Sequence, residues 1–448
     1  MEFLNLFGMI LKMGVLLLWL WGLLRIMDRK AVWQKILGIV IAFGIIQLFI
    51  SLQFGEFQIF TDFDKGLLFQ ACTMAMVALG LNLIYGFSGL FSLAQWGFYG
   101  VGAYAAADIT WRWTNGDPKG LIVVGLGTIL CGLAFFGVSR LIKLKRGIPV
   151  MSSFTFYLIA AVISCTVAVL VGRVAGPALA PLLGTSAQPG PLNGAVVQQI
   201  VFFFAVIFAG IVAAEVSFLF GLPILTLGSD YFGIATLGFS IVLNTLMINS
   251  DTILPFPEMK GGRGMIGIPK FTSWAWVFVF LLGVIVAMRN LIRSSTGRAI
   301  MAVREDEIAS KAMGINVANS KLLAFVVGSL FAGIGGGVYA HYIGFLSPKT
   351  FDFLPGFNPL IIVVFGGLGS MTGTLAAAFG WIFFLEGFLR VLLSKLGTDA
   401  PTWRYVLYPI TLLLVMLIKP EGLLGSVEWG FLKSMFVKRK TAGAKGGD

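Results

Sequence analysis

The stretch Arg289–Lys321 reads RNLIRSSTGRAIMAVREDEIASKAMGINVANSK, and it separates two long apolar runs near 272–289 and 322–343. It is the longest polar stretch in a chain of 448 residues that is 58% hydrophobic and only 12% charged. Soluble chains carry about 25% charged residues, and burying so many apolar side chains without lipid would need a core larger than one domain builds. The apolar runs approach the roughly 20 residues that a helix needs to cross the hydrocarbon. The sequence therefore predicts an integral membrane protein.

Thirteen apolar segments are candidates for membrane helices, and together they predict an all-α, polytopic transmembrane helical bundle. They lie near 8–24, 36–54, 66–86, 90–108, 121–139, 154–173, 197–220, 231–249, 272–289, 322–343, 357–371, 373–393 and 404–418. The segments near 90–108, 231–249 and 357–371 are short or rich in glycine. We therefore expect some broken or re-entrant helices within the bundle.

Charge counting predicts the orientation of the chain. If all thirteen segments cross, one set of loops (25–35, 140–146, 289–321 and the tail from Lys419) carries 20 Lys and Arg against 7 Asp and Glu. The opposite set carries 9 Lys and Arg against 10 Asp and Glu. The positive-inside rule then places the first set, including the C-terminus, in the cytoplasm. The net charge of +12 is thus mostly a topological signal, which disfavours nucleic-acid binding.

The basic tail residues Lys433, Lys438, Arg439 and Lys440 are expected to be solvated or to contact lipid headgroups.

The polar segment, Arg289–Lys321, is predicted to form one or two short surface helices. Ser295 or Thr296 can cap the start of a helix and Gly314 can end one. Between these signals, charged residues are mixed with apolar ones: Arg298, Arg304, Glu305, Asp306, Glu307 and Lys311 with Ile300, Val303, Ile308 and Met313. From composition alone, a docking site for a partner protein and a plain amphipathic loop are equally good interpretations.

Several stretches give this chain a family resemblance. The polar segment contains GRAIMAVREDEIASKAMGINVANSKLLAF, which resembles the cytoplasmic coupling loop of LivM-type permeases of branched-chain amino-acid ABC importers. Four further stretches resemble the same family in the same order: GLNLIYGFSGLFSLAQWGFYGVGAYAA (80–106), LTLGSDYFGIATLGFSIVLN (225–244), VVFGGLGSMTGTLAAAFG (363–380) and KPEGLLG (419–425).

The resemblance implies a single permease domain over 1–448, in a prokaryotic cytoplasmic (inner) membrane. Its implied partners are a LivH-like sister permease, two cytoplasmic ABC ATPase subunits and an extracytoplasmic solute-binding protein. The chain has no G-x-x-x-x-G-K-[S/T] sequence, so ATP would be used by the partner subunits, with no catalysis and no cofactor in this chain. Related permeases also imply urea, amides or other amino acids as alternative substrates.

Two features depart from the family pattern. Tyr104 and Tyr231 are unusually far apart, which predicts an insertion over 108–196 with two extra apolar segments that could lie at the periphery. The coupling pattern of ABC importers, E-A-A followed by Gly six residues after the Glu, is only approximate. Glu307 lies seven residues before Gly314, and Ile308 replaces the first Ala. ATPase coupling is therefore assigned to residues 291–320 as a segment.

Glycines and polar residues within apolar segments are candidates for the translocation pathway, because broken helices expose backbone groups that can line a wet cavity. By resemblance they belong to the translocation core: Asn82, Gly86, Ser88, Gly89, Ser92, Gln95, Gly97, Gly100, Thr236, Gly238, Gly366, Gly367 and Gly369. The G-x-x-x-G pairs Gly333–Gly337 and Gly369–Gly373 are better explained by close helix packing than by pore lining.

Few ionisable groups lie within the apolar segments. Glu386 and Arg390 are four residues apart and are expected to pair within the membrane. The single histidine, His341, is expected to be a packing residue, and the three cysteines predict neither a disulfide nor a metal site. The competing hypothesis is a secondary transporter or channel that couples ions through Glu215, Asp230, Glu386 or His341. A membrane enzyme is disfavoured, because catalytic residues do not cluster.

Overall fold

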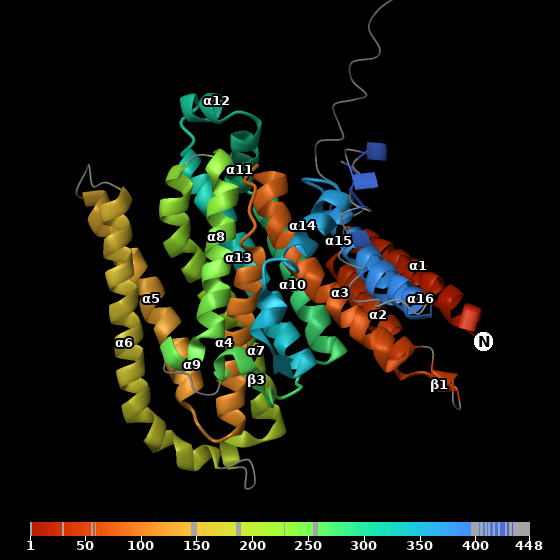
Figure 1. The fold of residues 1–448 in the computed structure, drawn as a ribbon, viewed down its shortest axis with the longest axis horizontal. Helices are drawn as coiled ribbons and strands as arrows, with labels where there is room; N and C mark the ends of the chain where they lie inside the picture. Colours follow the sequence, from red (N-terminus) through yellow and green to blue (C-terminus); the bar gives the residue numbers. More distant parts are fainter. Residues whose placement is uncertain are drawn as a thin grey trace, which may run out of the picture. The chain divides into compact units, whose positions relative to one another are not determined.

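The computed structural model describes residues 2–28, 31–54, 57–58, 60–144, 150–184, 190–227, 229–253 and 259–395, with scattered residues between 403 and 432. Helices dominate it, as predicted (Figure 1). The chain divides into two compact units, residues 1–71 with 362–448 and residues 72–361. Helices α3 (Asp62–Leu81) and α14 (Phe357–Gly366) run from one unit into the other. The single permease domain stays a prediction.

The larger unit, 72–361, contains most of the long helices and one short two-stranded sheet, in which β3 pairs antiparallel with β4. After the second half of α3, its elements follow as the π-helix η1 (Asn82–Phe87), α4 (Gln95–Thr114), α5 (Lys119–Leu144), α6 (Val150–Leu183), η2 (Pro191–Asn193), α7 (Ala195–Ile224), η3 (Leu225–Leu227), α8 (Ser229–Ile248), α9 (Ser250–Ile253), η5 (Gly261–Arg263), β3 (Met265–Ile266), α10 (Trp274–Arg293), α11 (Ser295–Glu305), α12 (Glu307–Ala312), α13 (Val317–Ile343), β4 (Phe345–Leu346) and η6 (Pro348–Phe351).

The smaller unit contains the two ends of the chain. Its elements are α1 (Glu2–Met27), α2 (Val32–Ser51), the hairpin strands β1 (Gln53–Phe54) and β2 (Phe57–Gln58), the start of α3, the end of α14, α15 (Met371–Trp381), the π-helix η7 (Ile382–Leu389) and α16 (Arg390–Lys395). An ion pair joins α1 to α3, because Lys12 Nζ lies 2.6 Å from Asp64 Oδ2 and Asp64 is only 2% exposed. Thr61 also donates to this carboxylate, through its amide and its hydroxyl.

Ten helices of the described residues are long and apolar enough to cross a membrane. They coincide with ten of the thirteen predicted segments. Of the other three, 90–108 falls on α4, which is 20 residues long, and 357–371 falls on α14, which has only 10 residues. The segment 404–418 lies largely outside the described residues, as do the basic tail residues. The segment 231–249 is uninterrupted in α8.

Helix α13 lies at the centre of the larger unit, and glycine allows its neighbours to approach closely. A Cβ added at Gly336 would lie 2.0 Å from the carbonyl oxygen of Tyr99 in α4. One added at Gly333 would lie 2.7 Å from the carbonyl oxygen of Ala209 in α7, and one at Gly337 would lie 3.4 Å from Ala209 Cβ. Close packing is therefore confirmed for the predicted pair Gly333–Gly337.

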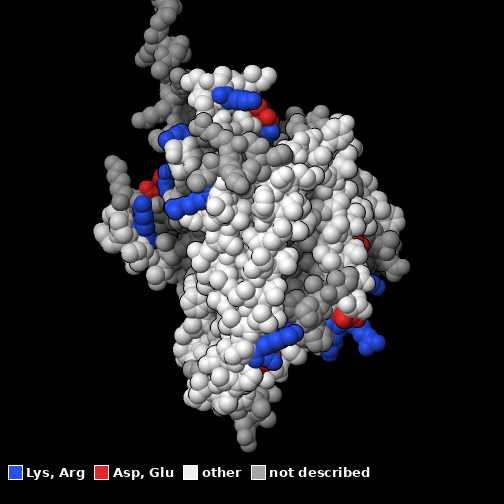
Figure 2. All heavy atoms as spheres, turned by 90° about the vertical axis from the view of Figure 1, so that its left-hand side faces the viewer, with Lys and Arg blue, Asp and Glu red and all other residues white. Residues whose placement is uncertain are grey.

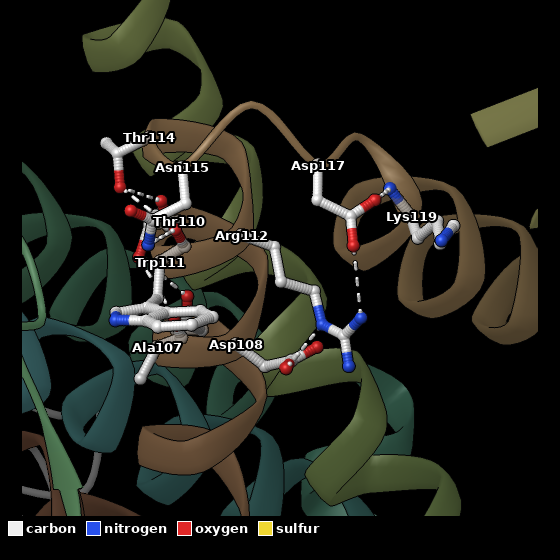
Figure 3. Close-up of polar contacts among 10 residues, drawn as sticks. Ala107, Asp108, Thr110, Trp111, Arg112, Thr114, Asn115, Asp117 and Lys119 are labelled. Atoms are coloured by element: carbon white, nitrogen blue, oxygen red, sulfur yellow. Dashed lines mark hydrogen bonds and ion pairs between the residues drawn. The ribbon is translucent and has the colours of Figure 1, made fainter. Parts of the chain in front are cut away.

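The predicted insertion over 108–196 contains two long helices, α5 and α6, that pack against each other. The insertion begins at the end of α4, and ion pairs hold the turn that connects α4 to α5 (Figure 3). Arg112 donates from Nε to Asp108 over 2.9 Å and lies 3.4 Å from Asp117 through Nη1. Asp117 in turn accepts a hydrogen bond from the amide of Lys119, the first residue of α5. Arg112 thus links the buried carboxylate of Asp108 in α4 to Asp117, which precedes α5.

Helix α6 presents a largely apolar surface. Only 17% of the residues in its most apolar stretch are buried, and exposed side chains include Ile163, Leu170 and Val174. On the face drawn in Figure 2, which is the α6 side of Figure 1, charged side chains gather toward two ends and the middle is uncharged. This pattern is typical of a surface that faces lipid between two aqueous boundaries.

Gly336→Ala tests the close approach of α4 and α13. The added methyl group would clash with the Tyr99 carbonyl, so the two helices must separate, and overpacking of this kind costs about 1–3 kcal/mol. We expect a lower thermal unfolding temperature in detergent. Gly283→Ala in α10 is the matched control, because a Cβ there meets nothing within 4 Å. An equal effect of the two changes would contradict the close contact.

Candidate functional site

Helical structure is interrupted between α3 and α4, at the start of the predicted segment 90–108. Helix α3 continues into η1, the helix then ends, and residues 88–94 are not helical before α4 begins at Gln95. Gly89 has φ +77°, a left-handed conformation that glycine adopts without strain. We call residues 88–94 the break. It confirms that this segment is broken and places the interruption before α4.

Side chains satisfy the polar groups of the break. The amide of Leu93 donates to Thr236 Oγ1 in α8 over 3.1 Å, and the Ser88 hydroxyl donates to the carbonyl of Ile84 over 2.7 Å. Ser92 Oγ accepts from the amide of Ala94 at 3.4 Å. Three predicted pathway residues, Ser88, Ser92 and Thr236, are therefore brought together around the break, and all three are buried.

Two buried amide side chains flank the break, Asn82 in η1 and Gln95 at the start of α4. Gln95 is only 2% exposed, and among the described residues neither Nε2 nor Oε1 of its amide has a hydrogen-bond partner. A buried amide without partners costs about 1–3 kcal/mol. This makes Gln95 the most unusual polar side chain of the site.

The predicted pathway glycines of α4 and α8 differ in their surroundings. A Cβ added at Gly97 would lie 2.9 Å from Leu243 Cδ1, and one at Gly100 would lie 2.9 Å from Met247 Cε. Both glycines therefore allow α8 to pack against α4. Gly238 in α8 has nothing within 4 Å of an added Cβ and faces open space. Gly97 and Gly100 thus lie in a helix contact, whereas Gly238 lies on a free surface of this chain.

The polar segment forms two short helices, α11 and α12, between α10 and α13. The N-cap of α11 is Ser294, whose Oγ accepts from the amide of Gly297 over 3.1 Å, so the prediction of Ser295 or Thr296 is wrong. Asp306 caps α12 by accepting from the amides of residues 308 and 309, and Asn316 caps α13. Gly314, with φ +82°, follows the end of α12 as predicted.

The apolar residues of the polar segment face two different ways. Ile300 and Val303 are buried, each 1% exposed. Ile308 and Met313 are 83% and 82% exposed. The seven predicted coupling residues are exposed as well: Arg298, Arg304, Glu305, Asp306, Glu307, Lys311 and Gly314. One pair of side chains therefore anchors the segment to the bundle, and the other pair is presented outward.

Two contacts tie the exposed part of the polar segment to the rest of the unit. Lys321 at the start of α13 forms an ion pair with Glu307 of α12. Arg304 of α11 donates from Nη1 to the backbone carbonyl of Gly86 in η1. A hollow of about 230 Å³ lies beside these contacts, lined by residues of the break and of the polar segment, including Ser88, Gly89 and Glu305.

The family motif at 363–380 lies in the smaller unit and forms a tight turn between α14 and α15. Gly367 and Gly369 have φ +117° and +79°. A Cβ added at Gly366 would lie 2.4 Å from the carbonyl oxygen of Gly373, so these two backbones are in close contact. The predicted helix-packing pair Gly369–Gly373 is wrong, because Gly369 is in the turn and the close pair is seven residues apart.

Residues near the C-terminus cover this turn. The amide of Leu423 donates to the carbonyl of Phe365 over 2.8 Å. Glu428 accepts hydrogen bonds from the amides of Met371 and Thr372, over 2.7 and 2.9 Å, at the start of α15. Burial raises the pKa of the Glu428 carboxyl above its ordinary value, and these hydrogen bonds oppose the shift. The motifs at 363–380 and 419–425 are therefore neighbours in the fold.

Comparison with known proteins identifies the family. Residues 65–416 match the model of the branched-chain amino acid transport system permease component. The chain belongs to this family.

Curated relatives of the family include LivM and LivH permeases. The chain is 31% identical to the high-affinity branched-chain amino acid permease LivM of Escherichia coli over 245 residues, which is 48% of this chain and 56% of that protein. It is 25% identical to a probable LivM of Methanocaldococcus jannaschii over 241 residues, 50% of this chain and 68% of that protein. Against LivH of E. coli it is 27% identical over 207 residues, covering 44% and 64%.

The chain spans a little over half the length of the LivM protein that it matches in E. coli. No solved structure matches it.

The other predicted ionisable residues of this permease-family chain belong to other elements than the break. Glu386 is half-buried in η7 and Arg390 is exposed at the start of α16, and their pairing stays a prediction. His341 is fully buried in α13, with Nε2 2.7 Å from the Thr110 hydroxyl and Nδ1 2.7 Å from the carbonyl oxygen of Gly337. These contacts agree with a packing residue. The side chain of Asp230 lies outside the described residues.

Sequence reasoning misses three sets of contacts in this chain. It assigns coupling to residues 291–320 as a segment, and the bond of Arg304 to Gly86 carries no local signal because 218 residues separate the two. Glu428 was part of a tail with no assigned role. The ion pairs of Arg112 with Asp108 and Asp117 could have been found, since Asp108 and Arg112 are spaced i, i+4 at the end of a helix.

Thr236→Val tests the contact that holds the break against α8. Valine keeps the shape of threonine but cannot accept the Leu93 amide, which leaves a buried donor unpaired at a cost of about 1–3 kcal/mol. We expect hydrogen exchange in residues 88–94 to accelerate about tenfold for each 1.4 kcal/mol lost. Thr245→Val is the control, because its hydroxyl bonds only within α8. Unchanged exchange in Thr236→Val would contradict the contact.

Proposed function

We propose that this chain is the permease subunit of an ATP-driven importer of branched-chain amino acids. The observation that carries the proposal is the polar segment, which is fixed by three side-chain caps yet presents Ile308 and Met313 to the outside. Exposed apolar side chains surrounded by charge suit a reversible protein interface. Family membership supports an ABC ATPase as the partner that covers them.

The complete transporter would contain a LivH-like sister permease, two ABC ATPase subunits and a solute-binding protein. Relatives of this chain bear both the LivM and the LivH name, which supports pairing of two related permeases. ATP would be bound and hydrolysed by the ATPase subunits, and this chain would contribute no cofactor and no covalent chemistry. Its own task is to hold half of the translocation pathway and to change its conformation when the ATPases close.

The charge distribution supports a multi-pass arrangement with the polar segment and the C-terminus in the cytoplasm. Lys and Arg are concentrated in the loops on the side of the polar segment, whereas the opposite loops carry nearly equal numbers of acidic and basic residues. The ATPases would then meet α11 and α12, and the solute-binding protein would meet the opposite side of the inner membrane.

The break is the best candidate for the part of the pathway that this chain lines. It combines an interrupted helix, backbone groups held by side chains, and the buried amide of Gln95 without a partner. Interrupted helices commonly form the substrate sites of transporters. The exposed Gly238 would lie where the sister permease approaches, because no described residue lies within 4 Å of a Cβ added there.

Uptake into proteoliposomes tests the function. The full complex, reconstituted with ATP inside and the binding protein outside, should accumulate labelled leucine, isoleucine or valine. Excess urea or an amide should not compete. If the complex instead took up urea or other amino acids, the proposed substrate class would be wrong. Uptake by this chain alone along an ion gradient, without an ATPase, would make it a secondary transporter and refute the proposal.

The double change Ile308→Ser, Met313→Ser tests the docking surface. Removing two exposed apolar side chains leaves the fold of this chain intact but takes away the apolar part of the interface, where hot-spot residues each contribute about 2 kcal/mol or more. We expect co-purification of the ATPase subunits to fall by about tenfold or more. Ile266→Ser, an exposed residue of β3, is the matched control. Unchanged co-purification would show that the ATPase subunits do not dock on α12.

A further inference from the structure

Among the described residues, no backbone amide beyond the end of η1 donates to the carbonyl of Gly86. Helix α3 and η1 run without interruption from Asp62 to Phe87, and a helix that ends leaves its last carbonyls without intrahelical donors. The nearby amides are used elsewhere, since Gly89 donates to Tyr85 and Leu90 donates to Ile84. The carbonyl of Gly86 instead accepts a hydrogen bond from the Arg304 guanidinium.

The geometry makes Arg304 a cap supplied from a distant element. A cation at the C-terminal end of a helix is favoured by the helix dipole as well as by hydrogen bonding to the free carbonyls. The fit is close, because a Cβ added at Gly89 would lie 3.4 Å from Arg304 Cγ, and Gly89 has φ +77°. The next residue, Glu305, lies 3.9 Å from Arg304 Nε and is a weaker partner.

Arg304 lies between the proposed docking surface and the break. It is in the last turn of α11, and Asp306, which caps α12, follows two residues later. The break is held on its other side by Thr236 of α8. Among the described residues of the polar segment, Arg304 is thus the one whose side chain hydrogen-bonds to the backbone of η1.

We propose that Arg304 is a positioning residue that transmits movement of the polar segment to the break, and is not itself a docking contact. This inference rests on the proposed function. When the ATPases displace α12 and α11, the guanidinium pulls on the end of η1 and shifts the break against Thr236. Loss of the bond should therefore separate ATP hydrolysis from transport while leaving the ATPases bound.

The first test measures coupling in the assembled complex. Arg304→Met keeps an unbranched, flexible stem but removes the guanidinium with its charge and its donors, and Arg304→Lys keeps the charge and a donor. We expect Arg304→Met to retain the ATPase subunits and to hydrolyse ATP within about twofold of wild type, while uptake per ATP falls about tenfold. Arg304→Lys should recover part of the uptake, since lysine can also cap a helix C-terminus.

Two results would overturn the inference in this test. One is normal uptake per ATP by Arg304→Met. The other is loss of the ATPase subunits in parallel with uptake, which would make Arg304 a docking contact. Absence of ATP-driven uptake in the wild-type complex would instead refute the proposed function.

A second test uses this chain alone and does not depend on transport. Hydrogen exchange in residues 88–94 should accelerate severalfold in Arg304→Met, because the end of η1 loses its cap. Arg298→Met is the matched control, since Arg298 also donates from its guanidinium to a carbonyl, that of Arg293, but its bond stays within the polar segment. Unchanged exchange at the break in Arg304→Met would refute the inference whatever the transport result.

Discussion

Hydrocarbon offers backbone amides and carbonyls no partner, and this constraint governs the whole chain. Helices meet it by bonding within themselves, which is why ten long apolar helices account for most of the described residues. Where a helix is interrupted, the constraint requires other groups to supply the missing hydrogen bonds. At the break, Thr236 supplies an acceptor for the Leu93 amide and Arg304 supplies a donor for the Gly86 carbonyl. The break therefore depends on side chains from other elements: one hydrogen bond joins α8 to Leu93, and the other joins α11 to the end of η1.

The same constraint explains the role of glycine in α13. Helices in lipid gain nothing from hiding apolar surface, so they associate through close contact of backbones and small side chains. Gly333 and Gly336 bring α13 against α7 and α4 at distances that any side chain would prevent. The larger unit consequently has a tightly packed centre formed by α4, α7 and α13, while α6 lies outside it with most of its apolar surface uncovered.

Sequence alone could predict the helices and the polar segment, because apolar run length and charge content are local properties. It could not predict which groups meet across the fold. Ser294, Ser295 and Thr296 are equally good N-cap residues, and the backbone turn that selects Ser294 depends on where α10 ends. The spacing of Gly369 and Gly373 matches a helix, but the chain turns at Gly369 with φ +79°. The bond from Arg304 to Gly86 spans 218 residues, so no local pattern encodes it.

The polar segment illustrates why residues of similar type can have opposite roles. Its apolar side chains divide into an inward pair, Ile300 and Val303, and an outward pair, Ile308 and Met313. Its charged side chains divide in the same way, since Lys311 points to the surface whereas Arg304 reaches the end of η1. A segment that only docked would need the outward group alone, and a segment that only packed would need the inward group alone. Because α11 and α12 carry both groups within a few residues, only a short stretch of chain separates the outward side chains from the one that contacts η1.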